Sequence, residues 1–248
     1  MQRNYKVVLA YDGTRYSGWE HKEGRDTIQG KLMQVLGHLA GDPVQVIGAG
    51  RTDAGVHARA MVASVKLDTS LSAEEIKDYV NQYLPDDISV TEVAEVSDRF
   101  HARYNATGKT YEYVIYDGKE KPVFDRKYVW NVKGRTDIEK MKKAALLLQG
   151  THDYAAFCKN PQKKKSTVRT VDRIEIQRDG DYVRFLFHGN GFLHHMVRIL
   201  TGTLVTIGQL RMEPHQAEQA LQTGDRLLAG VTAPAQGLTL IEIDYPAK

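Results

Sequence analysis

The sequence predicts an α+β protein with two halves of similar element order. In the first hundred residues, segments with alternating apolar residues and segments with 3.6-residue apolar spacing follow the order strand, helix, strand, strand, helix, strand. The second half repeats this order without obvious sequence identity. This is the order of a ferredoxin-like βαββαβ unit. We therefore expect two ferredoxin- or RRM-like halves, residues 1–105 and 106–248, which share a mixed, largely antiparallel sheet and form a cleft where they meet.

In the first half, Tyr5, Val7 and Leu9 lie two positions apart, which is typical of a strand with one buried face. Ser72 and Glu75 have the spacing of a capping box, which marks the start of a helix. The same patterns predict strands at residues 4–11, 44–47, 61–67 and 87–96, and helices at 27–40 and 72–83.

In the second half, Asp179-Gly180 separates two apolar stretches, which predicts a β-hairpin. Residues 102–108 are interpreted as a connector between the halves. The periodicity predicts strands at residues 109–117, 168–177, 182–188 and 237–243, a short edge strand at 128–130, and helices at 138–148, 191–207 and 213–222.

The composition is that of a soluble globular protein, with 42% apolar and 26% charged residues. No apolar run approaches the roughly 18 residues that a membrane span needs, and the first residues lead directly into a strand, so we expect no signal peptide. The single cysteine, Cys158, excludes an internal disulfide framework and fits a reducing compartment. We therefore expect a cytoplasmic protein. Since no CxxC or HExxH motif occurs, we expect no metal.

The net charge of +3 does not by itself suggest a polyanion partner, but the charge distribution is uneven. Positive residues cluster at Lys159, Lys163, Lys164, Lys165 and Arg169. Charge alone favours a solvated loop here. The alternative is a loop that contacts phosphates of a nucleic acid.

The segment GAGRTDAGVHA at residues 48–58 is the strongest candidate for chemistry. Three glycines within eight residues let the backbone turn tightly and let another molecule approach it closely. Asp53 is either a turn residue that bonds its own backbone or a working carboxylate. Arg51, two residues earlier, either pairs with Asp53 or reaches into a nucleic acid. For His57, a hydrogen-bonded loop histidine is favoured over a catalytic one.

Two other segments carry candidate residues. Tyr111 is either a strand residue that packs on the pleated face or a flat ring that stacks on a base. His194 and His195 are adjacent, and on a helix they would point about 100° apart, which makes a poor metal pair. We interpret the segment around them as a buried helix start from which Arg198 projects into a cleft.

The loop at 48–58 strongly resembles the GxGRTDxGVHA signature of the tRNA pseudouridine synthase A family. The resemblance covers essentially the whole chain, since further motifs match the family in order. These motifs are Tyr11–Trp19 with Thr27–Gln29, Lys109–Tyr113, Thr151–Phe157, Phe192–Arg198 and Gly237–Leu240. The combination is highly specific, whereas Arg-Thr-Asp alone would be a weak signal.

The resemblance implies the pseudouridine synthase fold with a central basic cleft. It also implies conversion of uridine to pseudouridine in the tRNA anticodon stem-loop, at positions 38, 39 or 40, by a homodimer that needs no cofactor. By matching position, Asp53 is the nucleophile or essential carboxylate, Tyr111 stacks on the target base and acts in proton transfer, and Arg169 pairs with Asp53. The implied substrate contacts are Arg51, Arg198, Lys163, Lys164, Lys165 and Leu240, with Leu238 as a less favoured alternative to Leu240.

One segment departs from the family pattern. The family often carries glutamine-rich sequence after the Gly-Trp pair, and here Glu20-His21-Lys22-Glu23 follows Trp19. Because that segment would lie near RNA, a paralogue with a different tRNA uridine target stays open.

Two further classes also stay open. One is a non-catalytic RNA-binding protein with RRM-like halves, although no aromatic RNP run occurs. The other is a metal-dependent hydrolase that uses Asp53, His57 and the pair at 194–195. The motifs of a two-carboxylate glycosidase, a nucleophile elbow and a P-loop do not occur.

Overall fold

The computed structural model describes residues 2–161 and 165–246. Contacts between α-carbons divide the chain into two units. Unit 1 comprises the chain up to Thr107 and again from Thr239 onward, and unit 2 comprises Gly108–Leu238. The last strand, from Thr239 onward, is grouped with unit 1 and pairs with a strand there, whereas the predicted boundary at residue 105 stays a prediction. The predicted sharing of one sheet by the two halves stays a prediction.

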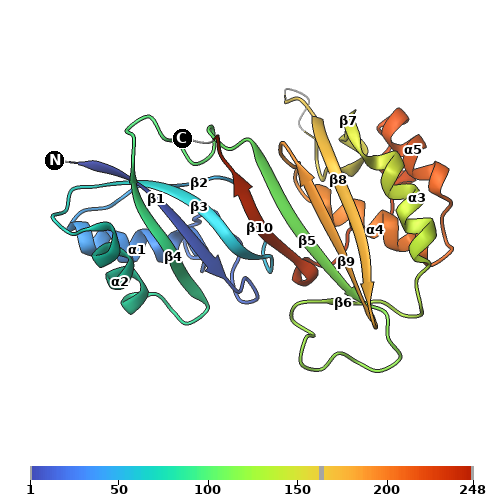
Figure 1. Cartoon of the computed structure of the whole chain (residues 1–248), viewed down its shortest axis with the longest axis horizontal. Coiled ribbons are helices and arrows are strands. Elements are labelled where there is room, and N and C mark those ends of the chain that lie inside the picture. Colours follow the sequence, from blue (N-terminus) through green and yellow to red (C-terminus); the bar gives the residue numbers. More distant parts are fainter. Residues whose placement is uncertain (1, 162–164, 247–248) are drawn as a thin grey trace. The chain divides into compact units, whose positions relative to one another are not determined.

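Unit 1 is organised around the strand β3 (Figure 1). Along one edge of β3, β1 pairs antiparallel, and β4 pairs antiparallel with the far edge of β1. On the other edge, β2 pairs antiparallel with residues 63–65, and β10 pairs parallel with residues 57–58. The elements are β1 (Arg3–Tyr11), α1 (Ile28–Ala40), β2 (Val46–Gly48), β3 (His57–Leu67), α2 (Ala73–Tyr83), β4 (Ile88–Val96) and β10 (Leu238–Asp244).

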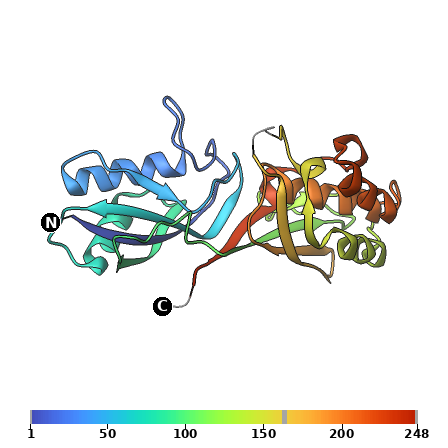
Figure 2. The ribbon, with the colours of Figure 1, turned by 90° about the horizontal axis from the view of Figure 1, so that it is seen from above.

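The two helices of unit 1 begin where their capping residues predict. The Thr27 hydroxyl accepts a bond from the backbone N–H of Gly30 at 3.2 Å, which caps α1. Ser72 and Glu75 form the predicted capping box at the start of α2. The apolar stripe of α1 is buried, and the helix lies along one side of the strands (Figure 2).

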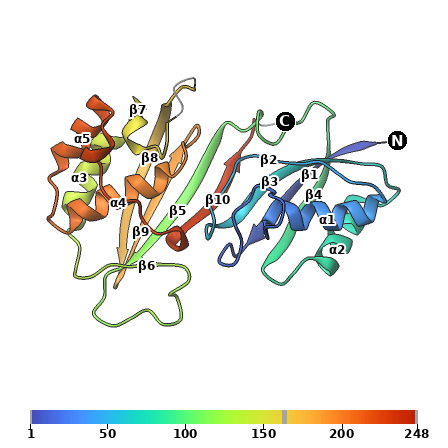
Figure 3. The same ribbon diagram turned by 180° about the vertical axis from the view of Figure 1, so that it is seen from behind.

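Unit 2 contains the antiparallel strand order β5-β9-β8-β7, with β6 parallel to β5. Its α-helices gather on one side of these strands (Figure 3). The elements are β5 (Gly108–Tyr116), β6 (Trp130–Asn131), α3 (Ile138–Leu148), β7 (Gly150–Asp153), η1 (Ala155–Phe157), β8 (Val168–Asp179), β9 (Tyr182–Gly189), α4 (Met196–Gly208), α5 (Pro214–Thr223), η2 (Arg226–Leu228) and η3 (Ala235–Gly237). Throughout residues 2–161 and 165–246, no helix combines the length and apolar character needed to cross a membrane.

The predicted α+β class with a mixed sheet is confirmed, but some boundaries are wrong. The helix predicted from residue 191 begins at Met196, because His195 adopts φ +61° in the left-handed region and interrupts any helix there. His194 and His195 therefore precede α4. The strand predicted from residue 61 begins at His57, where β10 extends the pairing. The four-residue strand β7 was not predicted, since so short a segment shows no distinctive period.

A buried carboxylate fixes one end of unit 2. The side chain of Asp117, directly after β5, is 0% exposed. It accepts bonds from Nη1 and Nη2 of Arg178 on β8, both at 2.8 Å, and from the backbone N–H and hydroxyl of Thr136 at 2.9 and 2.7 Å. Burial alone opposes ionisation, but these bonds outweigh it and hold the pKa of the Asp117 carboxyl below its usual value. One side chain thus ties together β5, β8 and the segment before α3.

Replacing Asp117 by alanine should lower the free energy of unfolding by about 3–5 kcal/mol, because Arg178 loses its partner inside the protein. Urea unfolding measures this loss. The exposed pair of Lys142 and Glu139 supplies the control, and Glu139→Ala should change stability by less than about 1 kcal/mol. If the Asp117→Ala protein is as stable as the wild type at pH 7, the buried pair of Asp117 and Arg178 does not stabilise the fold.

The same network predicts a pH dependence. The pKa of Asp117 is lowered in the folded protein, so its stabilisation is complete above the ordinary aspartate value of about 3.9 and is lost as the pH falls through the lower folded value. The stability difference between wild type and Asp117→Ala should therefore shrink only in that acidic range.

Candidate active site

The loop that carries Asp53 is held against the segment 12–19. The backbone N–H of Trp19 donates to the Thr52 carbonyl at 3.1 Å, and the Tyr11 and Thr52 hydroxyls lie 2.8 Å apart. The indole of Trp19 fills the space beside Gly48, where a Cβ atom would lie 2.5 Å from Nε1. These contacts position the residues that precede Asp53.

Two glycines allow this contact between loops. A Cβ atom at Gly13 would overlap the Val56 carbonyl oxygen, and one at Gly18 would lie 2.7 Å from the Thr52 carbonyl oxygen. Gly18 also has φ +97°, which disfavours any side chain. Buried His57 completes the contact, since its Nδ1 accepts the backbone N–H of Gly13 at 3.1 Å. This contact supports the interpretation of His57 as a hydrogen-bonded loop histidine.

Asp53 itself lies in a turn and is half-buried. Its backbone carbonyl accepts the N–H of Val56 at 3.1 Å, which closes the turn through Gly55 at φ +79°. Asp53 is therefore the first residue of a constrained turn, and its role as a working carboxylate stays a prediction. The turn fixes the backbone from which the carboxylate projects.

Arg51 forms an ion pair with Glu20. Its Nη1 lies 3.0 and 2.9 Å from the two carboxylate oxygens of Glu20. Glu20 belongs to the segment that departs from the family pattern. The sequence identifies Glu20 as a departure from the family pattern, but nothing in the sequence indicates that Arg51 is its partner.

Leu240 lies next to the end of the same loop. It is buried on β10, and its register partner on β3 is Ala58. Leu238 is also buried. Pairing between β10 and β3 therefore brings Leu240 to the strand that leaves the glycine loop, about 180 positions earlier in the chain.

In unit 2, Tyr111 and Arg169 share a neighbourhood around residues 191–192. Buried Tyr111 makes an edge-to-face contact with Phe192, with ring centroids 5.3 Å apart. Nη1 of Arg169 donates to the carbonyls of Ser166 and Val168 at 3.1 and 2.6 Å. A Cβ atom added at Gly191 would lie 3.8 Å from Nε and 3.9 Å from Cδ of Arg169.

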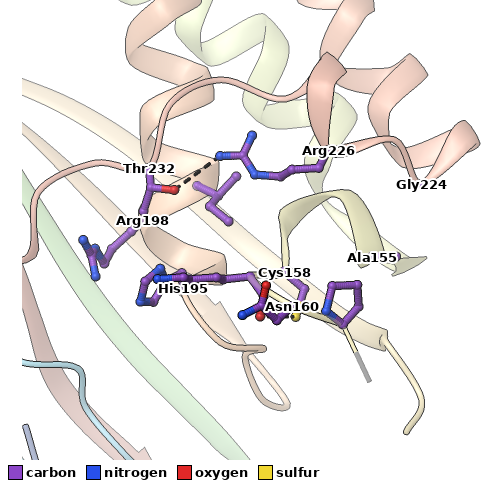
Figure 4. A pocket seen from close by; sticks show the side chains of 11 residues that line it. Ala155, Cys158, Asn160, His195, Arg198, Gly224, Arg226 and Thr232 are labelled. Atoms are coloured by element: carbon purple, nitrogen blue, oxygen red, sulfur yellow. Dashed lines mark hydrogen bonds between the residues drawn. The ribbon is translucent and has the colours of Figure 1, made fainter. Parts of the chain in front are cut away.

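Arg198, the remaining predicted cation, lines a pocket of about 550 Å³ in unit 2 (Figure 4). Its Nε donates to the Ala233 carbonyl at 2.8 Å. Lys159 and Arg226 also line the pocket, and the described lining residues include no carboxylate. Burial lowers the pKa of Arg226, whose Nη1 donates to the Gly230 carbonyl at 2.8 Å. The pocket is therefore a positively charged surface suited to a phosphate group.

Within unit 1, Arg51 and Asp53 lie on the loop at residues 48–56. Leu240 lies on β10, which pairs with β3 directly after that loop. Lys165 is exposed, whereas Lys163 and Lys164 lie outside the described residues. Sequence reasoning missed Arg226, because an isolated arginine carries no pattern that distinguishes it from a surface residue. It also missed the contact of Phe192 with Tyr111, because the contact joins positions on separate elements.

The close approach of the loops predicts the effect of adding one methyl group. Gly13→Ala should destabilise the protein by about 1–3 kcal/mol or more, because the new methyl group overlaps the Val56 carbonyl. Gly37→Ala is the control. There the Cβ would lie 3.4 Å from the Asp42 carbonyl oxygen, and α1 should gain about 1 kcal/mol. Thermal unfolding of the two variants compares them, and equal stabilities would contradict the contact.

Comparison with known proteins confirms the resemblance. A family model described as tRNA pseudouridine synthase matches residues 7–105 and 144–246. The tRNA pseudouridine synthase A of Bacillus sp. (strain KSM-64) is 45% identical over 243 residues, which cover 98% of this chain and 99% of that protein. The protein of the same name from Thermoanaerobacter sp. (strain X514) is 42% identical over 98% of this chain and 100% of its own length.

A solved structure of the archaeal box H/ACA sRNP Nop10-Cbf5 complex aligns with 95% of this chain and 46% of its own chain, at 13% identity and a TM-score of 0.40. This chain therefore spans about half of that one, and the likeness carries no weight beside the sequence matches. The family model covers most of both units, and the two relatives match nearly end to end. The chain therefore belongs to the tRNA pseudouridine synthase family.

Proposed function

We propose that this protein isomerises uridine to pseudouridine in tRNA. The observation that carries the proposal is the glycine loop, which holds Asp53 in a turn closed by Val56 and packed against Trp19. Membership of the tRNA pseudouridine synthase family supports it. The reaction breaks the bond from ribose C1′ to uracil N1, turns the base and joins C1′ to C5. Because the product is an isomer of the substrate, the overall reaction consumes no oxidant, reductant or second substrate.

In the proposed mechanism, Asp53 is the nucleophile or essential carboxylate. A carboxylate acts as a nucleophile only when it is ionised, and a paired guanidinium favours the ionised form and holds the rotamer. The family resemblance assigns this pairing to Arg169. Arg198 on α4 is the second candidate, because the bond from its Nε to the Ala233 carbonyl orients its guanidinium.

The remaining roles concern the target nucleotide. To react, it must leave the helical stack at a cost of a few kcal/mol. Tyr111 offers a ring for stacking, and Phe192 packs against that ring in an edge-to-face contact. Arg51 takes the place of the flipped nucleotide. Buried Leu240 supplies an apolar wall that excludes water, which would otherwise release free uracil.

Positive side chains of unit 2 supply the phosphate contacts in this proposal. They are Arg198 with Lys159 and Arg226 in the pocket, and Lys163, Lys164 and Lys165 in the adjoining segment. We further propose that the target lies at positions 38, 39 or 40 of the anticodon stem-loop, and that the protein acts as a cytoplasmic homodimer with a basic cleft. These finer assignments follow from the family resemblance.

Asp53 is tested with unmodified tRNA transcripts, without added metal or nucleotide, followed by mapping of pseudouridine. Wild type should modify an anticodon-stem uridine, and Asp53→Ala should lose turnover by roughly a thousandfold or more while its tRNA binding changes little. Arg169→Ala and Arg198→Ala in the same assay identify the partner of Asp53, because only the paired arginine should lose turnover on that scale. A wild type that binds tRNA but forms no pseudouridine would favour the non-catalytic RNA-binding alternative.

Tyr111→Phe separates stacking from proton transfer. The ring is kept, so tRNA binding should change less than about twofold, and loss of a general acid–base group should lower kcat by about 10²- to 10⁴-fold. Tyr113→Phe is the matched control on the same strand. Its hydroxyl donates to the Pro234 carbonyl at 2.7 Å, so its loss should affect stability and leave kcat near the wild-type value. Full activity of Tyr111→Phe would exclude a proton-transfer role for the hydroxyl.

A further inference from the structure

The ion pair between Glu20 and Arg51 connects an unexplained sequence segment to a proposed RNA contact. The two carboxylate oxygens of Glu20 lie 3.0 and 2.9 Å from Nη1 of Arg51. The side chains are 50% and 59% exposed, respectively. Both can therefore meet a ligand from solution, and the pair is weak enough for a ligand to break it.

The backbone around Glu20 is fixed on both sides. The N–H of Trp19 donates to the Thr52 carbonyl at 3.1 Å, so residue 19 is bonded to the neighbour of Arg51. The N–H of His21 donates to the Gln29 side chain at 2.7 Å, and the N–H of Gln29 donates to the Trp19 carbonyl at 3.0 Å. Glu20 thus faces Arg51 because the fold of unit 1 holds both ends of its segment.

The charge of Glu20 opposes contact between Arg51 and the phosphate groups around the flipped nucleotide, whose place Arg51 takes in the proposed mechanism. A phosphate group of RNA and the Glu20 carboxylate are both anions that accept bonds from a guanidinium, and they repel each other at short range. In the RNA-free protein the pair has no net charge. A phosphate must therefore displace the carboxylate before it gains the full attraction of Arg51. Both bonds from Glu20 use Nη1, so the edge formed by Nε and Nη2 is not engaged by Glu20 and offers a phosphate a first contact.

We propose that Glu20 is an internal competitor for Arg51, which it holds in the RNA-free protein and releases to a phosphate group of bound RNA. The inference rests on the proposed function in taking tRNA as the ligand. Its consequence is weaker binding of any RNA that uses Arg51, because each such RNA must first displace the Glu20 carboxylate.

The test replaces Glu20 by glutamine, which keeps the shape and one acceptor oxygen but removes the charge. The affinity for unmodified tRNA, measured by filter binding from 50 to 300 mM salt, should rise by up to about fivefold at 100 mM salt, as expected for an exposed pair. Without the Glu20 charge, Arg51 can neutralise an RNA phosphate and thereby release the counterions that were condensed on it. The plot of log K against log salt should therefore steepen by about 0.7–0.9.

Glu23→Gln is the matched control, because Glu23 is exposed in the same segment and its substitution changes the net charge by the same amount. It should alter the affinity less than twofold and leave the salt slope unchanged. In an Arg51→Ala background, Glu20→Gln should have no more effect than Glu23→Gln. A Glu20→Gln protein that behaves like Glu23→Gln, or that keeps its full effect without Arg51, would overturn the proposal.

The readouts separate this inference from the proposed function. Affinity and salt slope do not depend on turnover. A wild type that forms no pseudouridine would refute the proposed function, while the binding cycle still decides the role of Glu20. A wild type that forms pseudouridine, with an unchanged salt slope in Glu20→Gln, would refute the inference alone. Thermal melting of each variant verifies that it is folded.

Discussion

In unit 1, the backbone of residues 12–19 packs directly against the backbone of residues 48–56, and this contact constrains the loop that carries Asp53. Gly13 and Gly18 permit this contact because no Cβ atom fits between the two backbone segments. Gly48 permits the Trp19 indole to lie against residues 48–56. The bonds from Trp19 to Thr52 and from Gly13 to His57 then fix the loop without long side chains. A backbone contact of this kind has little freedom to relax. It therefore suits a carboxylate that must be held within a fraction of an ångström of a reacting atom.

The strand β3 extends this constraint to the rest of unit 1. It begins at His57, directly after the glycine loop, and pairs with β1, β2 and β10. The loop is therefore joined to a strand that is hydrogen-bonded on both edges. The parallel pairing with β10 also explains how Leu240, from the end of the chain, comes to lie beside Ala58. A rigid sheet with functional residues at a strand end is a common way to position chemistry on loops.

Two ion pairs of the protein differ strongly in burial. Asp117 is enclosed and receives bonds from Arg178 and Thr136, so separating it from its partner is costly and the pair serves stability. Glu20 and Arg51 are exposed, and solvent and salt screen their attraction to a fraction of that size. A weak pair adds little to stability. It can, however, exchange one anion for another at low cost, which is the property that a site for RNA phosphates requires.

The sequence by itself determined the family, the α+β class and most of the elements. Periodicity and capping residues act over a few positions, as at Ser72 and Glu75, and the glycine loop is a contiguous motif. Only the tertiary structure decided that His57 accepts a bond from Gly13, that β10 joins unit 1, that α4 begins after a left-handed His195 and that Arg51 pairs with Glu20. Each of these four features depends either on residues that are distant in the chain or on a single backbone angle. Neither cause produces a local pattern in the sequence. The sequence alone shows that Glu20 departs from the family pattern, but it does not show that Arg51 is the partner of Glu20. The ion pair exists only once the two loops have packed together.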